Sequence, residues 1–176
     1  SMMQAKVVLS GLFADNMVLQ QETDAALWGK AEPGAKVTIA GSWSKSKVTV
    51  TAGADGKWFA RIATPEAGGP YELTFNDGEK LTLKNVLIGE VWICSGQSNM
   101  EMQMKGYGSQ PVKGAADMIM TAKPSVPIRS CNVKRVLALD PAEDCEATWY
   151  EHTPVGVREA SATAYMFARK LQEVLD

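Results

Sequence analysis

The sequence predicts an N-terminal antiparallel β-sandwich followed by the first part of an α/β domain with a parallel sheet. Short runs of β-branched and aromatic residues recur between turn sequences up to about residue 85, and no helical pattern interrupts them. From residue 86 the pattern changes to one long apolar run, and then to segments with helical periodicity. We therefore expect two domains, a β-sandwich over residues 5–85 and the N-terminal portion of a catalytic domain over residues 86–176.

The predicted strands of the first domain alternate polar and apolar residues, as strands with one face in water do. Turn sequences such as Glu32-Pro33-Gly34 and Asn76-Asp77-Gly78 separate them, because glycine, proline and asparagine suit the backbone angles of tight turns. Strands at this spacing favour a small β-sandwich. The eight predicted strands cover residues 6–9, 17–19, 25–28, 36–39, 47–50, 57–62, 71–75 and 80–83.

The second domain begins with residues 86–94, a nearly continuous apolar run that is typical of a strand buried on both faces. Residues 128–136 form a second predicted strand, and residues 114–123 and 161–175 form predicted helices. This order favours right-handed crossovers and a parallel sheet. The last helix has an apolar face composed of Ala164, Phe167, Ala168, Leu171, Val174 and Leu175.

The second domain looks incomplete, because two parallel strands and two helices are too few to cover a sheet on both faces. The last helix also stops at Asp176 without a glycine cap or a following strand. We therefore expect a downstream segment or a partner chain to complete the sheet and to cover the apolar face of this helix. Ser1 before two methionines resembles an expression scar, so an original leader would have been removed.

Composition excludes several classes of function. The formal net charge of -2 provides no basic field for nucleic acid, and no apolar run approaches the roughly 20 residues of a membrane span. Cys94, Cys131 and Cys145 lack the spacing of a metal site, so we expect them to be free and mostly buried. We expect no metal and no organic cofactor.

The most informative segment is residues 91–102, where a predicted buried strand runs into a small polar turn. Ligands bind at such strand ends in open α/β sheets, and Gly96 permits a tight bend. If Ser98 begins a helical turn, its hydroxyl points into the crevice and its backbone N–H faces a developing oxyanion. A plainer interpretation is that Ser95, Ser98 and Asn99 merely cap a helix, and local physics alone favours it.

The extended string at residues 89–102 reads Gly-Glu-Val-Trp-Ile-Cys-Ser-Gly-Gln-Ser-Asn-Met-Glu-Met. It closely resembles the nucleophile block of the sialate O-acetylesterases, carbohydrate esterases of the SGNH hydrolase superfamily. The resemblance implies that the parallel sheet is of the flavodoxin type. Further stretches that resemble this family lie at residues 13–21, 28–29, 55–58, 153–154 and 161–169.

The resemblance implies that Ser98 is the catalytic nucleophile, which takes the acetyl group from an O-acetylated sugar to form an acetyl-serine. The backbone N–H of Ser98 would be one oxyanion donor, and Gly96, Gln97 and Asn99 would shape the oxyanion turn. The family's other groups are a glycine and an asparagine of the oxyanion hole and an Asp-x-x-His element, which we expect beyond these residues. No Asp-x-x-His occurs in this sequence, and a serine is a weak nucleophile without a base. We therefore expect the chain alone to be inactive.

Other chemically distinctive residues have plainer explanations. His152, the single histidine, does not fit the family pattern, and we interpret it as a surface or loop-anchoring residue. Met100, Met102 and Met104 are expected to pack beneath the nucleophile turn.

Two alternatives to a sialate O-acetylesterase stay open. The same serine block fits an acetyl xylan-type polysaccharide acetylesterase. The β-sandwich could instead be a non-catalytic glycan-binding module, for which Trp43 is a candidate, whereas Trp58 is assigned to the core. The expected partners are an O-acetylated sugar and the remainder of the catalytic domain, and the expected location is periplasmic or secreted.

Overall fold

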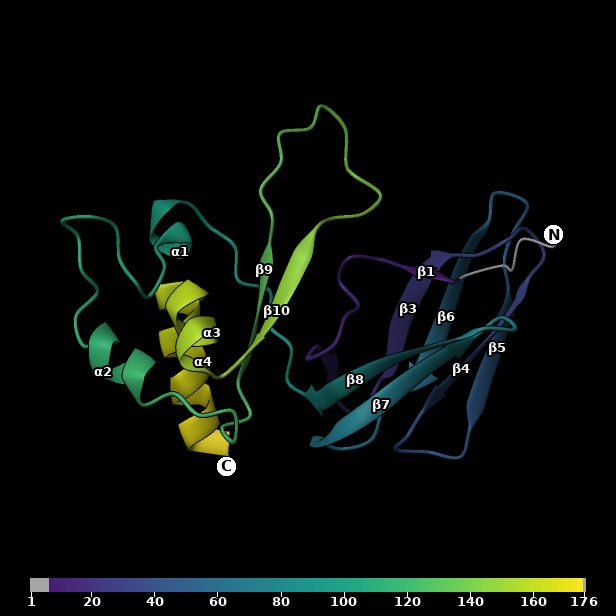
Figure 1. Ribbon diagram of the computed structural model, residues 1–176, viewed down its shortest axis with the longest axis horizontal. Helices are drawn as coiled ribbons and strands as arrows, with labels where there is room; N and C mark the ends of the chain where they lie inside the picture. Colours follow the sequence, from purple (N-terminus) through teal and green to yellow (C-terminus); the bar gives the residue numbers. More distant parts are fainter. Residues whose placement is uncertain (1–6, 176) are drawn as a thin grey trace. The chain divides into compact units, whose positions relative to one another are not determined.

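The computed structural model describes residues 7–175 and is shown in Figure 1. The chain divides into two compact units. The first unit runs to Val91 and also includes Lys134–Ala147, and the second comprises Trp92–Val133 and the chain from Thr148 onward. Each unit is described by itself below.

The first unit consists of two β-sheets. The smaller sheet has the strand order β1-β3-β6, and the larger has the order β2-β8-β7-β4-β5. All described strand pairs of this unit are antiparallel except β2 with β8, which is parallel. The predicted strands are thereby confirmed. Their bounds are β1 (Val8–Leu9), β2 (Val18–Gln20), β3 (Asp24–Lys30), β4 (Lys36–Gly41), β5 (Lys47–Thr51), β6 (Lys57–Ala63), β7 (Gly68–Asn76) and β8 (Lys80–Gly89).

The two sheets share one hydrophobic core. In β6 every second residue is buried, namely Trp58, Ala60 and Ile62, as the alternation of the sequence requires. The ring of Trp58 contacts the ring of Phe75 in β7, with 5.8 Å between the ring centroids. Trp58 therefore belongs to the core, as predicted.

The strand predicted over residues 86–94 is wrong in its second half. β8 continues through Val86, which is fully buried, but it ends at Gly89, and residues 90–97 form no strand. Ile93 is 94% exposed. The run was apolar enough for a buried strand, but β2 and β7 flank only its first part, and no described strand pairs with the rest. The predicted domain boundary between residues 85 and 86 consequently lies inside β8.

The second unit contains four helices and a two-stranded sheet among the described residues. The helices predicted over residues 114–123 and 161–175 and the strand predicted over residues 128–136 are confirmed, whereas α3 and β10 were not predicted. The bounds are α1 (Ser98–Glu101), α2 (Ala115–Met120), β9 (Arg129–Val133), β10 (Ala147–Glu151), α3 (Pro154–Glu159) and α4 (Ala162–Leu175).

The parallel sheet predicted for the second domain is not formed by residues 7–175. β9 pairs with β10, and the loop of residues 134–146 joins neighbouring ends of these two strands (Figure 1). The amide of Lys134 donates to the carbonyl of Glu146 at 2.8 Å, which continues the pairing into the loop. A parallel pair requires two strands in one sheet with a crossover between them. The first of the two expected strands belongs instead to the larger sheet of the first unit.

The apolar face predicted for α4 is partly exposed, as expected of a face that other residues would cover. Phe167 and Val174 of this face are 42% and 66% exposed. The helix instead buries Ala162 and Tyr165 against the rest of the second unit. The ring of Trp92 lies against Phe167, with 5.2 Å between the centroids, and partly covers the predicted face.

Independent folding of the β domain stays a prediction, and the course of β8 refines its test. We expect residues 1–91 to show β-rich circular dichroism and one cooperative thermal transition. Residues 1–85 should melt at a lower temperature, because that truncation removes the second half of β8 with buried Val86 and Ile88. If residues 1–91 show no cooperative transition, the β unit depends on the rest of the chain.

Candidate active site around Ser98

Ser98 is the first residue of α1, a single helical turn that follows the irregular segment 90–97. The amides of Met100 and Glu101 both donate to the carbonyl of Gln97 at 3.0 Å, and the amide of Met102 donates to the carbonyl of Ser98 at 3.0 Å. Ser98 thus lies at the start of a helical turn. A nucleophilic role requires this position, because the backbone N–H groups of a first helical turn can face a developing oxyanion.

The capping interpretation of this turn fails. The residue before α1 is Gln97, and its side chain makes no capping hydrogen bond. Among residues 7–175, no hydrogen bond involves the side chains of Ser95, Ser98 or Asn99, and all three residues are exposed. The polar side chains of the turn therefore do not serve to cap α1, and the Ser98 hydroxyl is accessible.

Gly96 lies close to the helix that it precedes. A Cβ atom at residue 96 would stand 3.2 Å from the Cβ of Met100, closer than most such contacts. Within the described residues, the backbone N–H groups of Ser98 and Asn99 donate to no other group. Two N–H donors thus lie next to the Ser98 hydroxyl, as the first turn of a helix generally leaves them.

Among residues 7–175, no side chain is hydrogen-bonded to the hydroxyl of Ser98, and the single histidine is engaged elsewhere. The ring of His152 is buried at 8% exposure and is engaged at both nitrogens. Its Nε2 lies 2.9 Å from the hydroxyl of Tyr165, and its Nδ1 lies 3.0 Å from the carbonyl oxygen of Lys123. His152 therefore connects the turn after α2 to α4. The loop-anchoring role is confirmed, and a surface position is wrong.

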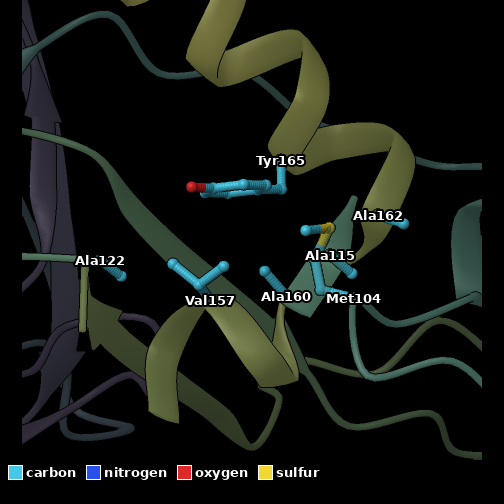
Figure 2. Close-up of a cluster of buried hydrophobic side chains, with 7 residues drawn as sticks. All are labelled: Met104, Ala115, Ala122, Val157, Ala160, Ala162 and Tyr165. Atoms are coloured by element: carbon cyan, nitrogen blue, oxygen red, sulfur yellow. The ribbon is translucent and has the colours of Figure 1, made fainter. Parts of the chain in front are cut away.

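The segment after α1 is held by a small hydrophobic cluster, shown in Figure 2. Met104 is fully buried there, and Met102 packs against the cluster from a partly buried position. Met102 and Met104 therefore pack into the interior as predicted, whereas Met100 is not part of this cluster. The buried members are Met104, Ala115, Ala122, Val157, Ala160, Ala162 and Tyr165. Burial in this cluster raises the pKa of Tyr165, the partner of His152.

Hydrogen bonds also fix the chain at the end of β8, within the first unit. The side-chain amides of Gln21 and Gln20 donate to the carboxylate of Glu90 and hold its pKa below the usual value. The side-chain oxygen of Gln20 accepts from the amide of Val91 at 2.9 Å. The irregular segment that leads to Ser98 therefore starts from a defined position.

The cysteines differ in part from the prediction. None of the three forms a disulfide bond, as predicted, but Cys94 is exposed and Cys131 and Cys145 are only partly buried. Cys94 was expected in a buried strand, and its exposure follows from the end of β8 at Gly89.

Among residues 7–175, no group of three or more His, Cys, Asp or Glu side chains is arranged to hold a metal ion. None of the described helices is long and apolar enough to span a membrane.

Two features of this unit were not predicted, and one of them carried a sequence signal. Thr153-Pro154 is the start of α3, where the Thr153 hydroxyl accepts from the amide of Gly156 and proline occupies the first turn. Thr163 donates from its hydroxyl to the carbonyl of Asn99 at 3.0 Å. The first could have been found from the capping pattern, whereas the second depends on tertiary structure.

Comparison with known proteins gives a consistent result. No protein-family model matches the chain. The chain is 30% identical to the sialate O-acetylesterase of Mus musculus over 93% of its length, and 30% identical to that of Homo sapiens over 92%. It covers 33% of each, so it spans about a third of the length of these curated relatives.

A solved structure is also similar. It is that of a carbohydrate acetylesterase from Xanthomonas citri, which is 29% identical and superposes with a TM-score of 0.88. The match covers 97% of this chain and 38% of that protein. Sequence and structure thus agree over nearly all of the residues. The chain belongs to the sialate O-acetylesterase family.

Proposed function

We propose that this chain supplies the nucleophile, Ser98, of a serine esterase that removes O-acetyl groups from sugars, with acetylated sialic acid as the first candidate substrate. The observation that carries the proposal is the exposed hydroxyl of Ser98 at the first residue of a fixed helical turn, in a member of this family. The intact fold would be a β-sandwich followed by an SGNH-type catalytic domain. The missing groups would come from a downstream segment or a partner chain.

The proposed reaction proceeds in two steps. The Oγ of Ser98 attacks the acetyl carbonyl carbon, a base takes the hydroxyl proton, and the sugar oxygen leaves with a proton as an alcohol. Water then attacks the acetyl-serine, which releases acetate and restores the hydroxyl. The backbone N–H of Ser98 would donate to the oxyanion in both steps, and Gly96, Gln97 and Asn99 would hold the turn in shape.

The alternative of a glycan-binding module depends on aromatic side chains of the β unit, and two of these rings make contacts within the unit. Trp43 donates from Nε1 to the carbonyl of Ala63 at 3.0 Å, and its ring lies where a Cβ of residue 41 would be. The guanidinium of Arg61 lies over the ring of Phe59 at 5.5 Å. Phe59 is nevertheless 55% exposed, so the panel of esters and glycans below decides between the module and the esterase.

Acetate release from a panel of esters tests the proposed function. We use the term full-length polypeptide for a chain that carries this sequence and extends over the whole length of its curated relatives. We expect it to hydrolyse p-nitrophenyl acetate and to prefer O-acetylated sialic acid over acetylated xylan. A preference for acetylated xylan would favour the polysaccharide acetylesterase. Binding of glycans without acetate release would contradict the esterase.

A periplasmic or secreted location is also part of this proposal.

A further inference from the structure

The turn that carries Ser98 is too short to hold its own shape. α1 has four residues, and helices of this length are unstable in water without tertiary contacts. The side chains of α1 contribute little to the stability of the turn, because none of its residues is buried and no side chain caps it. The position of Ser98 must therefore be set by bonds from α1 and the residues after it to the rest of the second unit.

These bonds lead to the beginning of α4. The amide of Ala162 donates to the carbonyl of Met102 at 2.7 Å, and the amide of Met104 donates to the carbonyl of Ala160 at 2.9 Å. Both are backbone bonds, which any side chain at these positions would allow. They fix the chain after the turn, four and six residues beyond Ser98.

Two side chains from the beginning of α4 reach the turn itself, in addition to Tyr107, whose hydroxyl donates to the carbonyl of Glu101 at 2.9 Å. The hydroxyl of Ser161 lies 3.3 Å from the Sδ of Met100, and it also accepts from the amide of Ala164 at 3.4 Å, as a capping side chain does. The hydroxyl of Thr163 donates to the carbonyl of Asn99 at 3.0 Å. This carbonyl belongs to the residue next to Ser98, and a four-residue helix leaves it without an intrahelical partner.

The bond of Thr163 joins distant parts of the second unit. Threonine hydroxyls in helices commonly bond to the carbonyl four residues earlier, and Thr121, the C-cap residue of α2, does so with the carbonyl of Asp117 at 2.7 Å. Thr163 instead bonds across the unit, to a residue 64 positions earlier in the sequence. Ser161 has a second role at the start of α4, whereas the hydroxyl of Thr163 makes only this bond among the described residues.

We propose that Thr163 is a positioning residue for the nucleophile, which holds the carbonyl of Asn99 and thereby the backbone of Ser98. The inference rests on the proposed function of Ser98. An esterase depends on the placement of its nucleophile, since a displacement of 1 Å can cost about a hundredfold in rate. Loss of the Thr163 hydroxyl should therefore lower kcat and leave KM nearly unchanged.

The test compares three substitutions in the full-length polypeptide. Thr163→Val keeps the shape of the side chain but removes the donor, and we expect it to lower kcat for p-nitrophenyl acetate about tenfold or more, with KM within about twofold. Thr163→Ser keeps the hydroxyl and should restore most of kcat. Thr121→Val removes an exposed local hydroxyl-to-carbonyl bond at the C-terminal end of α2 and should leave kcat unchanged.

Hydrogen exchange separates failure of this inference from failure of the proposed function. In Thr163→Val the amides of Met100, Glu101 and Met102 should exchange faster, which requires no catalysis. If exchange and kcat both match those of the parent protein, Thr163 does not position the turn. If exchange accelerates but Ser98→Ala keeps full turnover, the positioning of the turn stands and the nucleophile is another residue.

Discussion

Replacement of Ser98 by alanine in the full-length polypeptide is expected to lower kcat/KM for p-nitrophenyl acetate by about a thousandfold or more. The substitution removes the atom that forms the acetyl-enzyme, and the remaining oxyanion donors and binding contacts supply only residual catalysis. The fold should be unaffected. Ser98 is exposed, and within residues 7–175 its hydroxyl makes no hydrogen bond that alanine would lose.

A matched control is Ser109→Ala, which removes another exposed serine hydroxyl from the loop after α1. We expect this variant to retain the activity and the melting temperature of the parent protein. Both measurements are needed, because a loss of activity together with a loss of folded protein would say nothing about the nucleophile. Substantial turnover by well-folded Ser98→Ala would remove Ser98 from the mechanism.

The second large effect concerns residues 1–176 on their own, for which we expect negligible hydrolysis of p-nitrophenyl acetate. A serine without a base is a weak nucleophile, and each missing oxyanion donor costs roughly a hundredfold or more. Within residues 7–175, no side chain is hydrogen-bonded to the hydroxyl of Ser98. The one histidine, His152, contacts the hydroxyl of Tyr165 and the backbone carbonyl of Lys123 through its two ring nitrogens.

His152→Ala is the informative variant of this isolated chain. It should leave the low activity unchanged and lower the free energy of unfolding by about 1–3 kcal/mol, since the buried Tyr165 hydroxyl loses its partner. Thermal unfolding followed by circular dichroism measures the second effect. Turnover comparable to that of a complete esterase, and lost in His152→Ala, would show that this histidine takes part in the chemistry after all.

The β strands of the first unit could be predicted because their pattern is local. Alternation in segments such as Lys57–Ala63 reports which side chains face the core, and glycine-containing turns separate the strands. The end of β8 could not be predicted in this way. Residues 86–94 are apolar on both sides of Gly89-Glu90, and the neighbouring strands β2 and β7 decide that pairing stops at Gly89.

The candidate site was predictable only in part. The extended string around Ser98 identified the turn by resemblance, and the structure places Ser98 at the start of a helical turn, as expected. The contact between Thr163 and Asn99 joins residues 64 positions apart, so no local pattern indicates it. The parallel sheet was expected from the order of elements, but pairing partners are a property of the tertiary fold.

Covalent trapping tests the central claim most directly. The full-length polypeptide would be treated with a serine-directed fluorophosphonate, digested, and analysed by mass spectrometry to locate the adduct. We expect a single adduct on Ser98, loss of esterase activity in proportion to labelling, and no labelling of Ser98→Ala. Complete inactivation with the adduct on a different residue, and equal labelling of Ser98→Ala, would contradict the assignment of Ser98 as the nucleophile.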